Sequence, residues 1–189
     1  MSYIGNKPAN KAVVASDLDP AVITGQTALT SEPASTDEFL ISDAGVLKRL
    51  DASLIGGGKV LQVIVGTQSA SDSTSSSSFV ATTLNAAITP SATSSKVAFF
   101  MHSTSQIAGG ITCYDLYDGS NYASGGETRG LTAMEGNANA MRPVSFVGLL
   151  SPSTTSATTY TVHFKSSSGT STFGRTDTLS SLILMEIGA

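Results

Sequence analysis

The chain has 189 residues, of which only 13% are charged and 6% aromatic, whereas 30 are Ser and 23 are Thr. Because 40% of the residues are apolar, the chain can bury a core, which argues against a disordered protein, and the scarcity of helix-forming Glu, Lys, Arg and Gln argues against a helical bundle. The net charge is −4 and the Lys and Arg residues are scattered, so we expect no nucleic-acid partner; no apolar run is long enough to predict insertion into a membrane.

The first 55 or so residues are predicted to form extended arms with short elements. Pro8, Pro20 and Pro33 interrupt any long element there. A small hairpin is predicted over 38–50, with a turn in which Gly45 takes a positive φ. One capped helical turn is predicted over 51–55, before a glycine linker.

We divide the chain into an N-terminal arm, 1–58, and a C-terminal domain, 59–189. The glycine linker Gly56-Gly57-Gly58 marks the boundary. A lone hairpin is marginal in water, so the arm needs a partner surface or neighbouring copies of the chain to become ordered.

After the glycines, strand-like runs alternate with turns rich in Gly, Pro and Ser. This spacing favours an antiparallel β-sandwich or barrel. The predicted strands cover 61–65, 79–84, 97–102, 111–117, 144–150, 159–164 and 182–187. Tyr160, Val162 and Phe164 share one face of their strand, and the Ser and Thr of such alternating runs are expected on the outward face.

The single cysteine, Cys113, excludes an intrachain disulfide and a metal site with several cysteines, and we expect it in the core. His102 and His163 fit half-exposed positions in strands, and the spacings of the two His and the Cys match no zinc pattern. We therefore expect neither a metal nor a cofactor.

The longest weakly patterned stretch, 118–142, is predicted to be a functional or mobile loop. Tyr114 and Tyr117 lie three residues apart in a strand, so at most one of them is expected to be buried. Aromatic rings and Asn or Asp side chains near the Asp118-Gly119 turn suit sugar binding.

Catalysis has little support in the sequence, and we expect no enzymatic activity. No G-x-S-x-G motif exists for a Ser-His-Asp triad. Glu127, Glu135 and Glu186 are candidate carboxylates for a polysaccharide depolymerase, although Glu186 in the final strand could equally be an outward-facing residue.

Six segments of the chain follow a recognisable pattern: the opening MSYIGNKP, the hairpin segment FLISDAGVLKRL, and the C-terminal pieces SSKV, LSP, SATTYTV and LILMEI. These segments resemble tail-fibre and related virion proteins of marine tailed bacteriophages. Each motif is short, but together they span most of the chain. The chain lacks the repeat shaft of long fibres, which favours a short fibre, a head fibre or a capsid decoration protein.

The resemblance implies a virion structural protein that assembles in the host cytoplasm as a homotrimer, with a jelly-roll-like C-terminal β-sandwich. Copies of the chain, other virion proteins and a host-surface glycan or protein are the implied partners. Trimer formation would bury apolar strand faces that a small domain leaves exposed. The residues expected to dock on the virion are Tyr3, Ile4, Asn6, Phe39 and Ile41, and those expected to face the receptor are Asp118, Asn121, Tyr122 and Arg129.

Overall fold

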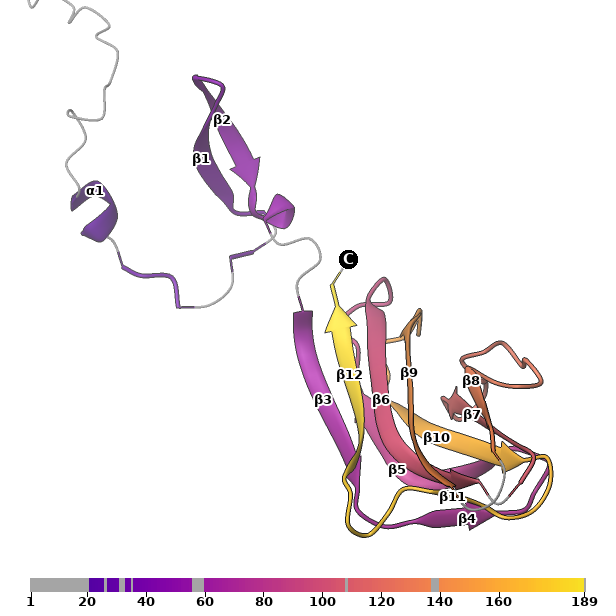
Figure 1. Cartoon of the computed structure of the whole chain (residues 1–189). Coiled ribbons are helices and arrows are strands. Elements are labelled where there is room, and N and C mark those ends of the chain that lie inside the picture. The colour runs from indigo at the N-terminus through magenta and orange to yellow at the C-terminus, as the bar shows by residue number, and fades with distance from the viewer. Residues whose placement is uncertain are drawn as a thin grey trace, which may run out of the picture. The chain divides into compact units, whose positions relative to one another are not determined.

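The computed structural model describes residues 21–25, 27–30, 33–34, 36–55, 60–107, 109–136 and 140–188. The chain divides into two compact units, Met1–Ile55 and Gly56–Ala189 (Figure 1). Helical structure among the described residues is limited to α1 (Ala21–Thr24) and the 3-10 turn η2 (Ala52–Leu54). No helix in this part of the chain has the length and apolar character to cross a membrane. The predicted mainly β class is confirmed.

The predicted hairpin is present in the first unit. It consists of β1 (Glu38–Asp43) and β2 (Val46–Asp51), paired antiparallel from end to end. The two residues between the strands, Ala44 and Gly45, have φ of 51° and 83°. Two positive φ values in a two-residue connection match the right-handed twist of the flanking strands, which is why Gly suits this turn.

The second unit is a β-sandwich whose described residues form ten strands. They are β3 (Val60–Gln68), β4 (Asp72–Thr74), β5 (Val80–Ile88), β6 (Lys96–Ile107), β7 (Ile111–Tyr117), β8 (Thr132–Glu135), β9 (Ala140–Leu150), β10 (Thr158–Ser166), β11 (Ser171–Phe173) and β12 (Ser180–Ile187). One sheet has the order β5-β10-β7-β8. The other has the order β3-β12-β6-β9, and β11 and β4 extend it beside the second half of β6 (Figure 1).

Eight of these strands pair in a nested order. β7 pairs with β8, β6 with β9, β5 with β10 and β3 with β12, so the first strand of the sandwich meets the last. The chain crosses between the sheets at most connections. Two four-stranded sheets formed in this way are the arrangement of a jelly roll, as expected for the C-terminal domain.

The core lies between the two sheets and comes from alternate residues of each strand. Tyr160, Val162 and Phe164 point inward from β10, as their alternation predicts. The largest fully buried apolar side chains are Tyr114, Phe99, Phe164, Phe173, Leu84, Ile88, Met101, Ile107, Leu116, Leu182 and Leu184. Burial of these side chains is the main favourable term for folding.

The strands extend beyond the predicted runs, and three short strands were not foreseen. β4 lies inside the Ser-rich segment 69–78, while β8 and the start of β9 lie inside the predicted loop 118–142. β11 is the third. These segments carry few large apolar residues, so their strands depend on backbone pairing with neighbours rather than on a hydrophobic pattern.

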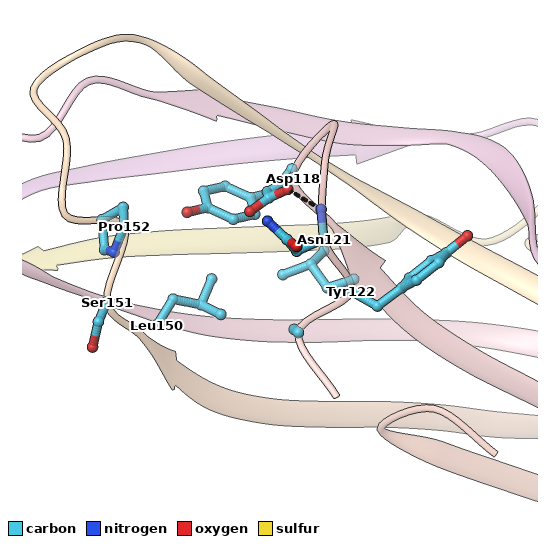
Figure 2. A pocket seen from close by; sticks show the side chains of 9 residues that line it. Asp118, Asn121, Tyr122, Leu150, Ser151 and Pro152 are labelled. Carbon is cyan, nitrogen blue, oxygen red and sulfur yellow. Dashed lines mark hydrogen bonds between the residues drawn. The ribbon is translucent and has the colours of Figure 1, made fainter. Parts of the chain in front are cut away.

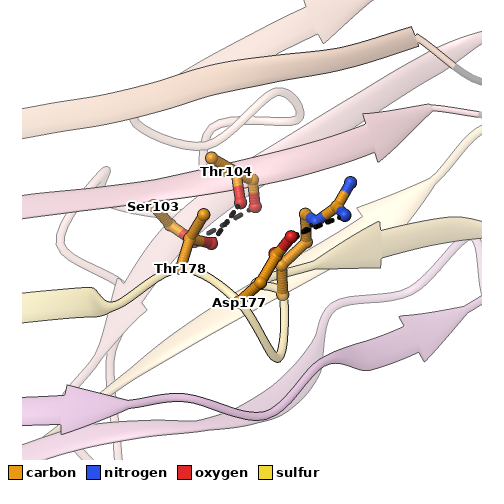
Figure 3. Close-up of polar contacts among 5 residues, drawn as sticks. Ser103, Thr104, Asp177 and Thr178 are labelled. Carbon is orange, nitrogen blue, oxygen red and sulfur yellow. Dashed lines mark hydrogen bonds and ion pairs between the residues drawn. The ribbon is translucent and has the colours of Figure 1, made fainter.

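Many Ser and Thr side chains lie inside the sandwich, contrary to the expectation that they face outward. The buried ones include Ser103, Ser105, Thr112, Ser166, Ser171 and Ser180. The hydroxyls of Ser103 and Ser180 are 2.7 Å apart, and the hydroxyl of Tyr114 donates to Ser105. Figure 3 shows hydroxyls beside this buried group, where Thr104 on β6 and Thr178 in the turn before β12 face each other. Their Oγ1 atoms are 3.1 Å apart. Buried hydroxyls are tolerated here because they bond one another and backbone carbonyls.

Candidate functional site

The segment 118–131, which joins β7 to β8, packs along β7 instead of projecting away from the sandwich. The backbone N–H of Ala123 donates to the carbonyl of Leu116 at 2.8 Å, and that of Leu131 donates to Tyr114 at 2.9 Å. We call this segment the β7–β8 loop. Its backbone bonds continue along β7 the edge pairing that β8 makes.

The buried carboxylate of Asp115 anchors the β7–β8 loop. Asp115 is fully buried, and its Oδ1 accepts from the N–H of Leu116 at 2.8 Å and from that of Ser124 at 3.2 Å. The hydroxyl of Ser124 donates to its other oxygen. A buried charge is tolerated only when its oxygens are hydrogen-bonded, and here Ser124 of the loop supplies two of the donors.

Four aromatic rings form a cluster beside this anchor. Tyr122 of the loop lies 4.8 Å from Tyr117, 5.1 Å from Phe79 and 5.5 Å from His163, measured between ring centroids. The Tyr122 hydroxyl is 3.1 Å from Nδ1 of His163. Burial lowers the pKa of His163, and the nearby charge of Asp115 opposes this only in part. The imidazole is therefore neutral at pH 7 and serves as a packing partner.

A small cavity, which we call the turn cavity, opens beside the Asp118 turn (Figure 2). Its volume is about 170 Å³. The residues that line it are Leu116, Asp118, Asn121, Tyr122, Ala123, Leu150, Ser151, Pro152 and Tyr160. Burial, together with the charge of Asp118, raises the pKa of Tyr160. The turn cavity thus combines apolar walls with an acid, an amide and a hydroxyl.

Asp118 holds the turn itself. Its Oδ1 accepts from the backbone N–H of Ser120 at 2.8 Å and from that of Asn121 at 2.6 Å. Figure 2 shows the ring of Tyr122 directed away from Leu150 and Pro152. The ring packs against Phe79 of the aromatic cluster instead. Asp118 and Asn121 therefore line one cavity together, whereas Tyr122 contributes little of its ring to it.

A second and larger cavity, which we call the basic cavity, lies over β7 and β10. Its volume is about 310 Å³. The residues that line it are Ser77, Ile111, Cys113, Thr128, Arg129, Lys165, Ser166 and Ser167. Arg129 therefore does not share the turn cavity with the other predicted receptor-facing residues. Sequence patterns do not predict that Lys165 lines this cavity, because only the pairing of β7 with β10 brings Lys165 opposite Cys113.

The two cations of the basic cavity have no carboxylate partner among the described residues. The Lys165 ammonium lies 4.5 Å from the ring centroid of Phe79, a cation–π contact. Burial raises the pKa of the Cys113 thiol, while the positive charges of Lys165 and Arg129 act to lower it. The cavity joins two uncompensated positive charges to several hydroxyls, a donor set suited to an anionic group.

The predicted docking residues lie in the first unit. Tyr3, Ile4 and Asn6 are outside the described residues, as is the glycine linker. Phe39 and Ile41 alternate on one face of β1, with Phe39 exposed and Ile41 half-buried.

The structure corrects the alternative that Glu186 faces outward, because it lies fully buried on the inner side of β12. Its carboxylate accepts from the N–H and hydroxyl of Ser91, at 2.7 and 2.6 Å, and from Gln62. Glu127 and Glu135 are exposed. Tyr114 is buried and Tyr117 lies on the outer face, as the strand spacing predicts.

Arrangements for hydrolysis or metal binding were sought in the described part of the chain. In this part of the chain, the hydroxyl of Ser124 bonds to Asp115, and His163 bonds to Tyr122. No hydrogen bond between the described residues joins a serine to a histidine, as a catalytic triad would require. No cluster of three or more His, Cys, Asp or Glu side chains is placed to hold a metal ion within these ranges.

No protein-family model matches the chain, and no curated protein is significantly similar to it in sequence. Solved structures that resemble it distantly include the following two. A chain from the structure of infectious bursal disease virus Gx strain has a TM-score of 0.35 and 13% identity, over 76% of this chain and 40% of that one. A chain from T=1 particles derived from infectious bursal virus has a TM-score of 0.34 and 12% identity, over 78% and 39%. At these scores the likeness supports no argument, and the assignment of the fold rests on the strand pairing described above.

Proposed function

We propose that this chain is a virion structural protein, a short homotrimeric fibre that docks through residues 1–58 and presents its β-sandwich to the host surface. One observation carries the docking part of this proposal. The hairpin unit is separate from the sandwich and leaves large apolar side chains in water: Leu40 is 73% exposed and Val46 58%.

A two-stranded hairpin with exposed apolar residues on a separate unit is marginal alone. It gains stability when those side chains are buried against another surface, as in a disordered or marginal segment that becomes ordered on binding. The ion pair between Glu38 and Arg49, at 2.9 Å on the surface of the hairpin, adds little by itself. Docking onto another virion protein would supply the missing burial.

The receptor-facing part of the proposal is supported by the β7–β8 loop and its cavities. The turn cavity offers Asp118 and Asn121 to hydroxyl groups, and the basic cavity offers Arg129 and Lys165 to an acidic group. A host-surface glycan that carries carboxylate or sulfate groups fits both. Jelly rolls occur among capsid and lectin domains, which is an argument from analogy of fold alone.

A virus particle assembled with variant chains tests the docking. Phe39→Asp places a charge on the hairpin face that also carries Leu50 and Val46, and should deplete the chain from purified particles, measured by quantitative mass spectrometry. The control Ala87→Asp adds the same charge at an exposed position of β5 and should leave incorporation unchanged. Deletion of 1–55 should leave a folded sandwich that fails to join particles.

Normal incorporation of both the Phe39→Asp chain and the deleted chain would contradict docking through the first unit. Gold-labelled antibodies against the chain distinguish the possible positions on the particle. Label on the head would indicate a head fibre or a capsid decoration protein instead of a tail fibre. Release of reducing ends from host polysaccharide, abolished by Glu127→Ala or Glu135→Ala, would instead identify a depolymerase.

A further inference from the structure

The outer face of the β3-β12-β6-β9 sheet carries two complete rows of apolar side chains. Residues directly opposite one another in an antiparallel sheet project from the same face. The strand registers align one row as Val63, Met185, Ala98 and Leu149, and the next row as Val65, Ile183, Phe100 and Val147. We call these eight residues the apolar face.

A polar row borders the apolar face. In the same registers the next row is Thr67, Ser181, His102 and Ser145. The two apolar rows hold no Asp, Glu, Lys or Arg, although the chain has 24 such residues when its 10 basic and 14 acidic residues are added. The corresponding face of the other sheet differs, because the β7–β8 loop covers part of it and β5 exposes Ala81, Thr83, Asn85 and Ala87 there.

Most of the apolar face lies in water in the single chain. The exposed fractions of Val63, Val65, Phe100, Val147 and Leu149 run from 45% to 64%. Together these five side chains leave roughly 500 Å² of apolar surface, near the upper end of the largest patch on an ordinary monomer. The partly exposed Ile183 and Met185 add to it, so the patch is of the same order as the ~800 Å² that each partner buries in a standard interface.

We propose that the apolar face is the surface through which copies of this chain associate, so that its occupant is the same face of a second copy. This deepens the homo-oligomeric part of the proposed function, on which it rests. An uncharged face of this size needs no charge complement, and two equivalent sheets can pack face to face at about 10 Å with interdigitated side chains. The polar row then forms a hydrogen-bonding rim, as at other interfaces.

Burial of the apolar face also explains why alternation fails on these strands. β3, β12, β6 and β9 carry apolar residues on both faces, which is the pattern of strands covered on both sides. The core covers the inner face, and a second copy covers the outer one.

The test compares two leucines in the full-length chain. Leu149 lies in the apolar face and is 64% exposed, whereas Leu54 lies in the first unit and is 72% exposed. Wild-type chain, measured by light scattering after size exclusion, should have a multiple of the monomer mass of 19.2 kDa. Leu149→Asp should reduce this to the monomer mass because a charge in the packed face is left unpaired, and Leu54→Asp should not change it.

A monomeric wild-type chain, or a Leu149→Asp chain that keeps the oligomer mass, would overturn the proposal. Dissociation by Leu54→Asp alone would place assembly in the first unit and overturn it as well. These measurements use purified chain without virus particles. An oligomer that fails to enter particles would therefore refute the proposed function and leave this inference standing.

Thiol labelling gives a second measurement that does not place a disruptive charge in the assembly. The native Cys113 is buried, so a cysteine introduced by Val147→Cys dominates the reaction with a maleimide. Labelling should be at least tenfold slower in concentrated than in dilute protein, because dilution dissociates the oligomer and exposes this cysteine. A cysteine introduced by Leu54→Cys should label at one rate throughout, and equal behaviour of the two positions would contradict the proposal.

Discussion

Glu186 is, with Asp115, one of the two fully buried acids of the sandwich among the described residues. It connects three elements. Gln62 comes from β3, Ser91 from the turn between β5 and β6, and Glu186 itself from the end of β12. Burial alone would raise the pKa of Glu186, but the hydrogen bonds from Gln62 and Ser91 outweigh it and lower the pKa to about 2.

The lowered pKa of Glu186 makes stability depend on pH in a defined direction. The unfolded chain binds the proton near the ordinary value of 4.5, so the stabilisation is complete above that pH and is lost as the pH falls toward 2. Replacing Glu186→Gln should lower the free energy of unfolding at pH 7 by about 1–3 kcal/mol, because hydrogen bonds to a charged group are lost. Urea unfolding at pH 7, 4 and 2.5 measures both effects.

The exposed Glu135 supplies the control for this prediction. Glu135→Gln should leave the pH dependence of the wild type intact, whereas Glu186→Gln should flatten it between pH 4.5 and 2. An unchanged acid limb in the Glu186→Gln chain would show that other carboxylates carry it.

The burial of Tyr114 is consistent with its spacing from Tyr117, but the partner of its buried hydroxyl could not be predicted from the sequence. The strand period separates it from Tyr117 and allows one of them to be buried, yet the buried one needs a partner for its hydroxyl. That partner is Ser105 on β6, which in turn donates to the carbonyl of Thr172 at 2.8 Å. Burial raises the pKa of Tyr114 to about 12.

At the scale of elements, the β7–β8 loop is held by the side chain of Asp115 on the neighbouring strand as well as by its own backbone bonds. Its residues are rich in Gly and have no strand or helix period. Asp115 fixes the conformation of the loop in its place, because its carboxylate accepts hydrogen bonds from both the N–H and the hydroxyl of Ser124. The loop that is proposed to face the receptor is therefore held in shape before binding, which reduces the entropy lost on binding.

Removal of the anchor should loosen the loop without unfolding the sandwich. In the Asp115→Ala chain we expect amide hydrogens of Ala123 and Leu131 to exchange at least tenfold faster, since each bonds to β7 through the loop. Amide exchange read by mass spectrometry measures this. Asp177→Ala, in an exposed turn paired with Arg175, should leave the loop unchanged.

Exchange in the loop as slow as in the wild type would show that the aromatic cluster alone holds it. Faster exchange throughout the core strands would show instead that Asp115 supports the whole sandwich.

On the scale of the whole molecule, the nested pairing makes the fold depend on its last strand. β12 lies between β3 and β6, and its residues pair with segments that the chain synthesises far earlier. Such distant pairings make loop closure costly and folding slow. Partly folded forms without β12 are unfavourable, because β3, the first strand of the sandwich, then has no neighbour in its sheet.

A chain that ends at Leu179, and so lacks β12, should show no cooperative thermal unfolding. It loses Leu182 and Leu184 from the core as well as Glu186. Deletion of 1–55 is the matched control, because it removes more residues but takes them from a separate unit. Calorimetry of the two truncated chains measures the difference, and a cooperative transition in the chain without β12 would refute the dependence.

Much of the architecture was accessible from the sequence. The β class, the jelly-roll-like sandwich, the hairpin with its Gly45 turn and the inward face of β10 are all present as expected. These features depend on local alternation and turn chemistry, which residues near one another in the chain determine.

The tertiary structure decided what local patterns cannot encode. It placed Ser and Thr inside the sandwich, because hydroxyls from β6, β7, β11 and β12 become one another's partners only after folding. It placed Asp118 in the turn cavity and Arg129 in the basic cavity, which Lys165 also lines. It also aligned apolar residues of four strands into one face, since a strand shows its own alternation but not its register against strands far along the chain.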